Sequence, residues 1–226
     1  MAKLLPEFHS SFVIRHFHAM KKLKTSPLLV LISAPSGGGK TTLCNHLLAS
    51  RPDMVRAITC TTREPRKGEK DGVDYHFFSA AEFERRERAG EFIEHATVYG
   101  NSYGILKSEL LGKLRSGRDV LLNVDVQGAA TIRKRVRSVP ELKRALVTVF
   151  LAPPSIMELE ARLKNRASDS AAVIRRRLAV ARQEIAQWKT FDYLLTSATK
   201  PEDLRRMLAI VEAEKMRAAR TEAPGL

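Results

Sequence analysis

The chain has 226 residues, of which 44% are hydrophobic and 28% are charged, the balance of an ordinary globular domain. No apolar run approaches the roughly 20 residues that a membrane-spanning helix needs, so no membrane partner is expected. The 39 basic residues outnumber the 25 acidic ones, and the formal charge of +14 favours anionic partners. Phosphorylated small molecules are expected rather than nucleic acid, because the basic residues are not interleaved with the aromatic side chains on which single strands stack.

The two cysteines, Cys44 and Cys60, form neither a CxxC pair nor a zinc pattern. Two reduced thiols are typical of a cytoplasmic protein, and we expect no secretory signal. Residues 1–25 are mixed, basic and aromatic, and we expect a poorly ordered extension there. Met20 is an alternative start of the functional chain, and a basic targeting peptide is the other interpretation of this segment.

Apolar runs and helical patterns alternate along the chain. Strands are expected at 28–33, 55–59, 119–125, 145–151 and 191–196. Helices are expected between and after them, at 41–49, 105–116, 128–137, 155–166, 170–189 and 201–219. Ser155 and Glu158 form a capping box at the start of one of these helices. The runs at 119–125 and 145–151 are nearly continuous, as in strands buried on both faces of a parallel sheet.

This alternation predicts an α/β protein with a doubly wound parallel sheet and helices on both faces. Residues 61–104 interrupt the pattern with a helix at about 80–89 and several glycines. Residues 75–78 and 92–99 alternate like half-exposed antiparallel strands. We interpret this stretch as a small mixed insertion beside the main sheet, in which a second substrate is bound.

The strongest motif is a glycine-rich loop between the first predicted strand and the first predicted helix, the context that indicates a P-loop. Its glycines let several backbone N–H groups point at one phosphate chain, and the helix N-terminus adds its positive dipole end. Lys40 is placed to reach the β- and γ-phosphates of ATP, and Thr41 offers its hydroxyl to Mg²⁺. Ala34 departs from the pattern, which has glycine there. The predicted ATP-binding residues are Ala34, Pro35, Ser36, Gly37, Gly38, Gly39, Lys40, Thr41 and Thr42.

From about residue 28 to 217 the sequence resembles the guanylate kinase family. The resemblance is carried by APSGGGKTT at 34–42, TTREPRKGEKDGVDYHF at 61–77, EFIEHATVYGNSYG at 91–104, DVQG at 125–128, APPSIMELEARLKNRASDS at 152–170 and FDY at 191–193. It implies a P-loop NTPase-type sheet with an acceptor-binding insertion and a helical lid. The implied division is an extension at 1–25, a domain at 26–219 and a tail at 220–226. Within the domain, the core is about 28–60, 118–151 and 178–219, the GMP-binding part about 61–105 and the lid about 152–177.

The resemblance also implies an acceptor site for the phosphate of GMP. Arg63 and Arg66 match the family's two phosphate-binding arginines, and a planar fork of donors suits a phosphate better than lysine does. Tyr75 and Tyr103 match the phenol donors to the same phosphate. Thr59 stands where the family has a serine that contacts this phosphate, and its hydroxyl can substitute.

Guanine presents an N1–H and an exocyclic amine side by side, and one carboxylate can accept from both. Glu94 matches the family residue that does this, and Glu69 matches another acidic residue that lines the pocket. A site built on such hydrogen bonds rejects analogues that lack the donors. Taken singly, each of these residues has an alternative interpretation as a loop charge or a packing residue.

Arg162, Arg166 and Arg177 match family arginines that close over the phosphates during transfer. Arg162 and Arg166 are four residues apart and therefore share a helix face. Asp125 follows a buried strand where P-loop enzymes commonly hold an acidic residue near Mg²⁺. We expect it to hold a metal-bound water or orient the acceptor, and a structural hydrogen bond is the competing interpretation.

Several positions depart from the family. Ile105 replaces a serine or threonine that meets guanine, which removes one hydrogen bond. Asn123 replaces an aspartate and removes a negative charge near the acceptor. Ser197 stands near an adenine-contacting asparagine, and Ala167 replaces a lid glycine. These changes leave room for weaker guanine selectivity.

The sequence therefore predicts an enzyme that transfers phosphate from Mg-ATP to GMP, and to dGMP, in purine nucleotide metabolism. A related P-loop kinase with another phosphorylated acceptor is the first alternative. A non-catalytic guanylate-kinase-like module is the second, and the intact P-loop argues against it. RNA binding rests on the net charge alone.

Overall fold

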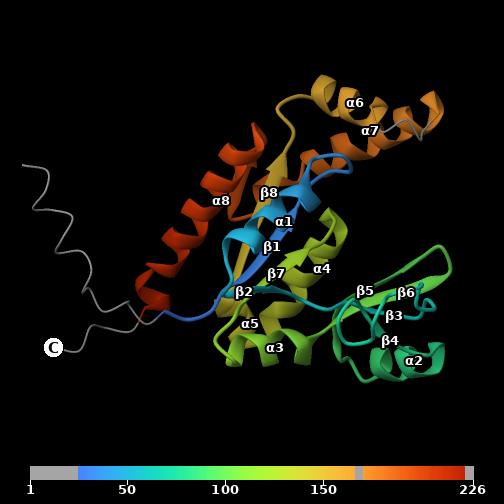
Figure 1. The fold of residues 1–226 in the computed structure, drawn as a ribbon, viewed down its shortest axis with the longest axis vertical. Coiled ribbons are helices and arrows are strands. Elements are labelled where there is room, and N and C mark those ends of the chain that lie inside the picture. Colours follow the sequence, from blue (N-terminus) through green and yellow to red (C-terminus); the bar gives the residue numbers. More distant parts are fainter. Residues whose placement is uncertain (1–24, 166–169, 222–226) are drawn as a thin grey trace, which may run out of the picture.

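The computed structural model describes residues 25–165 and 170–221. Its main sheet has five parallel strands in the order β2-β7-β1-β8-β9 (Figure 1). These strands are β1 (Leu29–Ser33), β2 (Met54–Arg56), β7 (Asp119–Asn123), β8 (Leu146–Ala152) and β9 (Tyr193–Thr196). The predicted doubly wound α/β fold is confirmed, and all five predicted strands are present.

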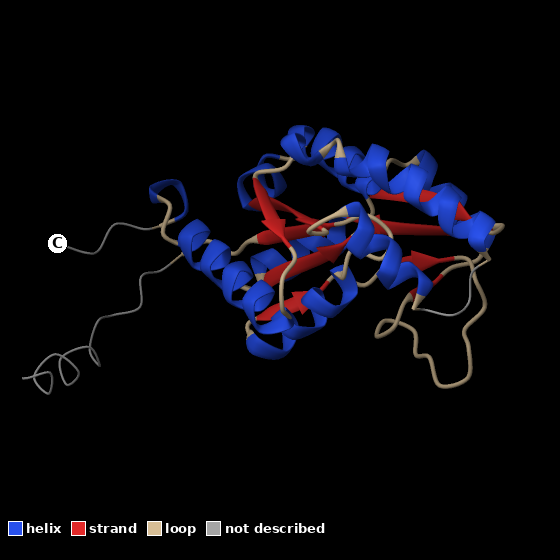
Figure 2. Cartoon of the chain, turned by 90° about the horizontal axis from the view of Figure 1, so that it is seen from above, coloured by secondary structure: helices blue, strands red, loops and turns tan. Residues whose placement is uncertain are grey.

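Helices cover both faces of this sheet (Figures 1 and 2). The helices of the main domain are α1 (Lys40–Ser50), α3 (Lys107–Arg115), α4 (Val126–Arg135), α5 (Pro140–Ala145) and α8 (Lys200–Lys215). Strand β1 is fully buried, and alternate residues face opposite sides: Leu29 and Leu31 join the core under α3, α4 and α5. Val30 and Ile32 join the core under α1 and α8. This two-sided burial explains the near-continuous apolar runs in the sequence.

Residues 57–106 contain a second sheet with strand order β4-β3-β6-β5. Its strands are β3 (Cys60–Thr61), β4 (His76–Phe77), β5 (Phe92–Val98) and β6 (Asn101–Leu106), and α2 (Ala80–Arg88) packs on it through Phe83. The hairpin of β5 and β6 is antiparallel, whereas β4 pairs with β3 in parallel. The prediction of an antiparallel strand at 75–78 was therefore wrong in direction. In Figure 1 this unit projects from one end of the main sheet.

Helices α6 (Ile156–Lys164) and α7 (Ala171–Ile185) form a pair at the same end (Figure 1). They pack on each other through Leu159, Leu163, Ile174 and Ala181. The hydroxyl of Ser155 accepts the Glu158 N–H at 3.0 Å, as the capping box predicts. No helix within the described residues is long and apolar enough to cross a membrane.

Some element boundaries differ from the prediction. Helix α3 begins at Lys107 rather than 105, because Ile105 and Leu106 complete β6 and are buried. Helix α5 was not predicted, and α7 and α8 each end four residues early. The extension at 1–24 and the last residues of the tail, 222–226, lie outside the described part of the chain.

Candidate nucleotide site

The glycine-rich loop joins β1 to α1 at the carboxyl edge of the main sheet, where ligands bind in open α/β folds. Gly37 and Gly39 have φ angles of 87° and 92°, which favour glycine because they lie in the left-handed region. The Gly38 N–H donates to the Pro35 carbonyl at 2.9 Å and closes the turn. Ala34 is buried in the core and is accommodated there in place of glycine.

Lys40 is the first residue of α1, and its Nζ donates to the Val124 carbonyl at 2.7 Å. Burial lowers the pKa of this ammonium group, and the nearby Asp125 carboxylate acts in the opposite direction. The residue after β7 thus holds the side chain, which lines the cavity over the loop.

A cavity of about 410 Å³ lies over the loop. It is lined by residues 34–42, which are the predicted ATP-binding residues, and by Asp125 and Glu184. Glu184 on α7 was not predicted. Burial raises the pKa of its carboxyl group, and its Oε2 accepts no hydrogen bond from any residue that the structure describes. The sequence signal was weak: Glu184 lies two helical turns after Arg177, on the same face of α7.

A second cavity, of about 420 Å³, adjoins the other side of the loop. Its lining includes Gly37, Arg162, Ser197 and Lys200. Arg162 donates to Glu158 at 3.2 Å and to the Ser197 hydroxyl at 3.4 Å, so this predicted lid arginine lies beside the loop. Ser197 is buried and donates to Asp203 at 3.1 Å.

Helix α6 of the α6–α7 pair packs directly on the loop. A Cβ placed on Gly37 would lie 2.9 Å from Cδ2 of Leu163 and 3.1 Å from Cδ1 of Leu159. Arg177 is half-buried on α7. Arg166 and Ala167 lie outside the residues that the structure describes.

The insertion gathers four of the predicted acceptor residues. The Arg63 guanidinium donates to both oxygens of Glu69 at 2.9 and 3.0 Å and lies over the ring of Tyr75. The rings of Tyr75 and Tyr103 are 6.4 Å apart, and the Tyr103 hydroxyl lies within reach of Arg63. The Glu69 side chain raises the pKa of Arg63, and the Arg66 N–H, which donates to Glu69 at 2.7 Å, lowers that of Glu69.

The side chain of Arg66 is exposed. Thr59 precedes β3, and its carbonyl accepts the His76 N–H at 3.0 Å. Ile105 is buried in the main core opposite Glu94 on β5, so it takes a packing role. Asn123 is half-buried at the end of β7.

Glu94 stands on β5 against the first turn of α4. Its Cδ lies 3.7 Å from where a Cβ on Gly128 would be, an ordinary van der Waals distance. Burial and, secondarily, the Asp125 carboxylate raise the pKa of Glu94 to about 7, and Arg135 opposes them. Asp125 itself caps α4 by accepting the Gly128 N–H at 2.7 Å. The structural hydrogen bond expected as the alternative for Asp125 is therefore present.

Asp125 connects the two halves of the site. Its charge acts on Lys40 in the phosphate cavity and on Glu94 in the insertion. The glycine-rich loop at the carboxyl edge of the sheet and the half-buried Glu94 carboxylate are thus both coupled to Asp125, and the insertion holds an arginine–tyrosine cluster besides. Such an arrangement can hold two phosphorylated molecules and discriminate a base that presents paired N–H donors.

Comparisons with known proteins agree with this geometry. The family model for guanylate kinase matches residues 26–214. The chain is 44% identical to a guanylate kinase of Aromatoleum aromaticum over 84% of this chain and 90% of that protein, and 40% identical to one of Paramagnetospirillum magneticum over 85% and 87%. The crystal structure of guanylate kinase from Anaplasma phagocytophilum superimposes with a TM-score of 0.65 at 32% identity and covers 90% of this chain and 94% of that one. The chain therefore belongs to the guanylate kinase family.

Proposed function

We propose that the chain transfers the γ-phosphoryl group of ATP to GMP, and to dGMP, and releases ADP and the nucleoside diphosphate. One observation carries this assignment: Asp125 lies within electrostatic reach of both Lys40 in the P-loop cavity and Glu94 in the insertion. The phosphates of ATP and the base of GMP would then bind at adjacent positions on either side of Asp125. The two buried, unpaired cysteines, Cys44 and Cys60, suit the reducing cytoplasm that we propose for this reaction.

Phosphoryl transfer requires positioning and charge neutralisation more than covalent chemistry from the protein. Backbone N–H groups of the P-loop after Pro35, which has none, bind the phosphates of ATP, and Lys40 neutralises the charge that develops on the moving group. Arg162, Arg166 and Arg177 of the lid segment, about 152–177, add donors from the other side. Closure of the lid excludes water, which otherwise competes with GMP.

The insertion, about 61–105, binds GMP. Arg63 and Arg66 bind its phosphate together with the hydroxyls of Tyr75, Tyr103 and Thr59. Since Arg63 is paired with Glu69 in this structure, GMP must share or replace that ion pair. Glu94 accepts the N1–H and the amine of guanine, and Glu69 lines the pocket.

Residues of the phosphate cavity fit Mg²⁺ as the accompanying metal. The hydroxyl of Thr41 and the carboxylates of Asp125 and Glu184 are hard oxygen ligands, and one Glu184 oxygen accepts no hydrogen bond from the described residues. Thr41 would hold the ion directly, and Asp125 would hold it through water. When bound, the ion neutralises charge on the phosphates of ATP.

The test is an ADP-release assay with Mg-ATP that offers GMP, dGMP, AMP, UMP and CMP in parallel. Turnover with GMP and dGMP alone supports the assignment, and Lys40→Met serves as the inactive control. Turnover with none of them, alongside retained ATP binding, would refute the acceptor assignment and leave only the P-loop function.

A further inference from the structure

Arg135, the last residue of α4, contacts strand β5 on both sides of Glu94 in the sequence. Its Nη1 donates to the Phe92 carbonyl at 3.3 Å, and its Nη2 lies 3.2 Å from Nε2 of His95. Helical side chains lean toward the N-terminus, which lets Arg135 reach back along α4 to β5. Its two contacts fall on the residues that flank the segment Ile93–Glu94.

That segment is irregular. Phe92 pairs with Leu106 and Glu94 pairs with Ile105, so Ile93 is an extra residue in the ladder, a β-bulge. Ile93 is completely buried in the main core. Bulges re-aim side chains, and this one leaves Glu94 against the first turn of α4. Arg135 donates to the backbone at the bulge and is therefore placed to fix its shape.

The charges around Glu94 come from several elements. Asp125, at the start of α4, disfavours the ionised form of Glu94, and Arg135, at its end, favours it. On the same strand, His95 has its Nδ1 3.7 Å from Glu87 on α2. On β6, the residue opposite Glu94 is the uncharged Ile105. The positive charge of Arg135 thus partly offsets the effects of burial and of Asp125 on the pKa of Glu94.

We infer that Arg135 is a positioning residue for guanine recognition, which fixes the bulge that orients Glu94. The inference rests on the proposed function, because it requires Glu94 to accept hydrogen bonds from guanine. Arg135 touches neither substrate in this scheme. Its effect is therefore expected on the affinity for GMP rather than on the transfer step.

The test compares Arg135→Met, which removes the guanidinium group and its positive charge, with Arg135→Lys, which keeps the positive charge. Lys134→Ala is the matched control, since it removes one positive charge from an exposed position on the same helical turn. For each protein, kcat and the KM values for GMP and ATP are measured between about pH 5.5 and 8.5. Thermal unfolding is recorded in parallel.

Arg135→Met is expected to raise the KM for GMP roughly tenfold at neutral pH, the scale of one hydrogen bond to a charged group. The rise of this KM on acidification should begin at a higher pH than in the wild type. Arg135→Lys should keep the wild-type pH profile with an intermediate KM, and Lys134→Ala and all KM values for ATP should stay within about twofold.

The results separate failure of the inference from failure of the proposed function. The inference is overturned if the wild type phosphorylates GMP and Arg135→Met has the same KM for GMP and the same pH profile as the wild type. A lowered melting temperature with unchanged kinetics would mean that Arg135 has a structural role only. If the wild type does not phosphorylate GMP, the proposed function fails, and the inference fails with it. If the wild type phosphorylates GMP but Glu94→Gln binds GMP equally well, Glu94 does not recognise guanine, and the inference is overturned while the proposed function stands.

Discussion

The proposed role of Glu94 in guanine recognition comes at the expense of stability. Its carboxylate is useful only when ionised, yet burial and Asp125 raise its pKa to about 7. Burial disfavours the charged form of Lys40 as well, and it lowers the pKa of its ammonium group. Both residues are held where their charge is costly, which is typical of functional sites.

The pKa of Glu94 predicts a pH dependence of GMP binding. Below pH 7 the ionised fraction falls about tenfold per pH unit, so the KM for GMP should rise steeply while the KM for ATP changes little. The phosphate of GMP itself has a second pKa of about 6, which adds its own dependence. Glu94→Gln should keep only the phosphate contribution. Identical pH profiles for the two proteins would contradict the prediction.

The same shift affects stability. Because the pKa of Glu94 is raised in the folded state, the stability that it contributes is present below the unfolded value of 4.5 and is lost as pH rises through about 7. Glu94→Gln should therefore gain stability over the wild type as pH rises across this window. Urea unfolding at several pH values measures the difference, and a difference that did not vary with pH would refute the prediction.

For Lys40 the expected effects on activity and stability have opposite signs. Lys40→Met should lower kcat by about two to three orders of magnitude, the scale for a lost charge-stabilising donor. Its melting temperature should equal or exceed that of the wild type, because a partly buried charge is replaced by an apolar side chain of similar length. Full activity in this variant would exclude the assigned role.

At the scale of elements, close contacts connect the α6–α7 pair to the loop and the insertion to α4. Leu163 of α6 packs on Gly37 of the loop, and Glu94 of β5 packs against the first turn of α4. Within the insertion, a Cβ on Gly104 of β6 would lie 2.8 Å from the ring of Phe92. In contrast, Gly112 on α3 is exposed, and a Cβ there would meet nothing within 4 Å.

Two substitutions test this contrast. Gly112→Ala should raise the free energy of unfolding by about 0.5–1 kcal/mol, since glycine is a poor helix former. Gly104→Ala should lower it by about 1–3 kcal/mol through overpacking against Phe92. It should also raise the KM for GMP, because the Glu94 carbonyl lies 3.2 Å from the added methyl group. Chemical denaturation and kinetics decide both, and equal stability of the two variants would contradict the argument.

The elements also show what the sequence can predict. The five strands of the main sheet and the P-loop were predictable, because apolar runs and the glycines that end them are signals within a short stretch of sequence. The parallel pairing of β4 was not, because a strand of two residues carries no pattern that indicates the direction of its partner. Helix α5, with six residues, is too short to show a helical period, although Pro140 and Glu141 mark its start.

Within the site, the set of Arg63, Glu69, Tyr75 and Tyr103 was predictable as a group, and the structure brings them together. Their mutual pairing was not predictable, because it depends on where a long loop folds back. Glu184 and Arg135 were not predicted at all. Both lie outside the quoted sequence motifs, and only the tertiary placement of α7 and α4 brings them near the site.

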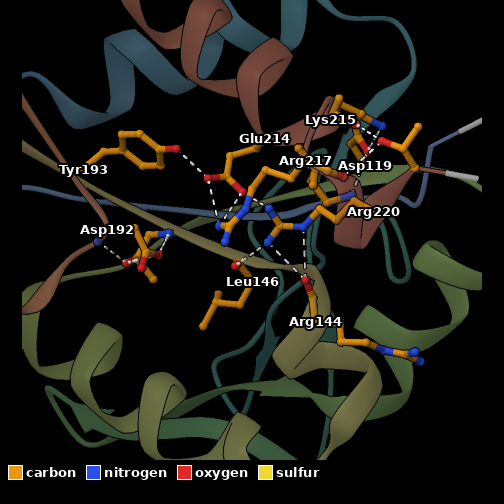
Figure 3. Close-up of polar contacts among 12 residues, drawn as sticks. Asp119, Arg144, Leu146, Asp192, Tyr193, Glu214, Lys215, Arg217 and Arg220 are labelled. Atoms are coloured by element: carbon orange, nitrogen blue, oxygen red, sulfur yellow. Dashed lines mark hydrogen bonds and ion pairs between the residues drawn. The ribbon is translucent and has the colours of Figure 1, made fainter. Parts of the chain in front are cut away.

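For the whole molecule, a buried ion pair joins the end of the described chain to the main sheet (Figure 3). Glu214 on α8 and Arg220 are 2% and 9% exposed. Arg220 pairs with Glu214 and donates to the carbonyls of Arg144 and Leu146, and the Tyr193 hydroxyl donates to Glu214. Leu146 begins β8, so this cluster lies at the amino edge of the sheet, opposite the P-loop.

The cluster predicts a stability effect without a kinetic one. Arg220→Met removes the buried cation beside Glu214 and leaves only the Tyr193 hydroxyl and the exposed Arg217, which should lower the free energy of unfolding by about 3–5 kcal/mol. Adding Glu214→Gln removes the buried negative charge of Glu214, so the double variant should be more stable than Arg220→Met alone. Arg217→Ala, an exposed neighbour of Glu214, should change stability by less than about 0.5 kcal/mol.

The measurement is a double-mutant cycle by urea denaturation, with kcat and KM determined for each variant. A favourable coupling energy between Arg220 and Glu214, together with unchanged constants for ATP and GMP, would show that the amino edge of the sheet supports the fold independently of catalysis. Additive stability losses would mean that Arg220 acts through the carbonyls of Arg144 and Leu146 instead. A changed KM would mean that the two edges of the sheet communicate, since no residue of this cluster lines either nucleotide cavity.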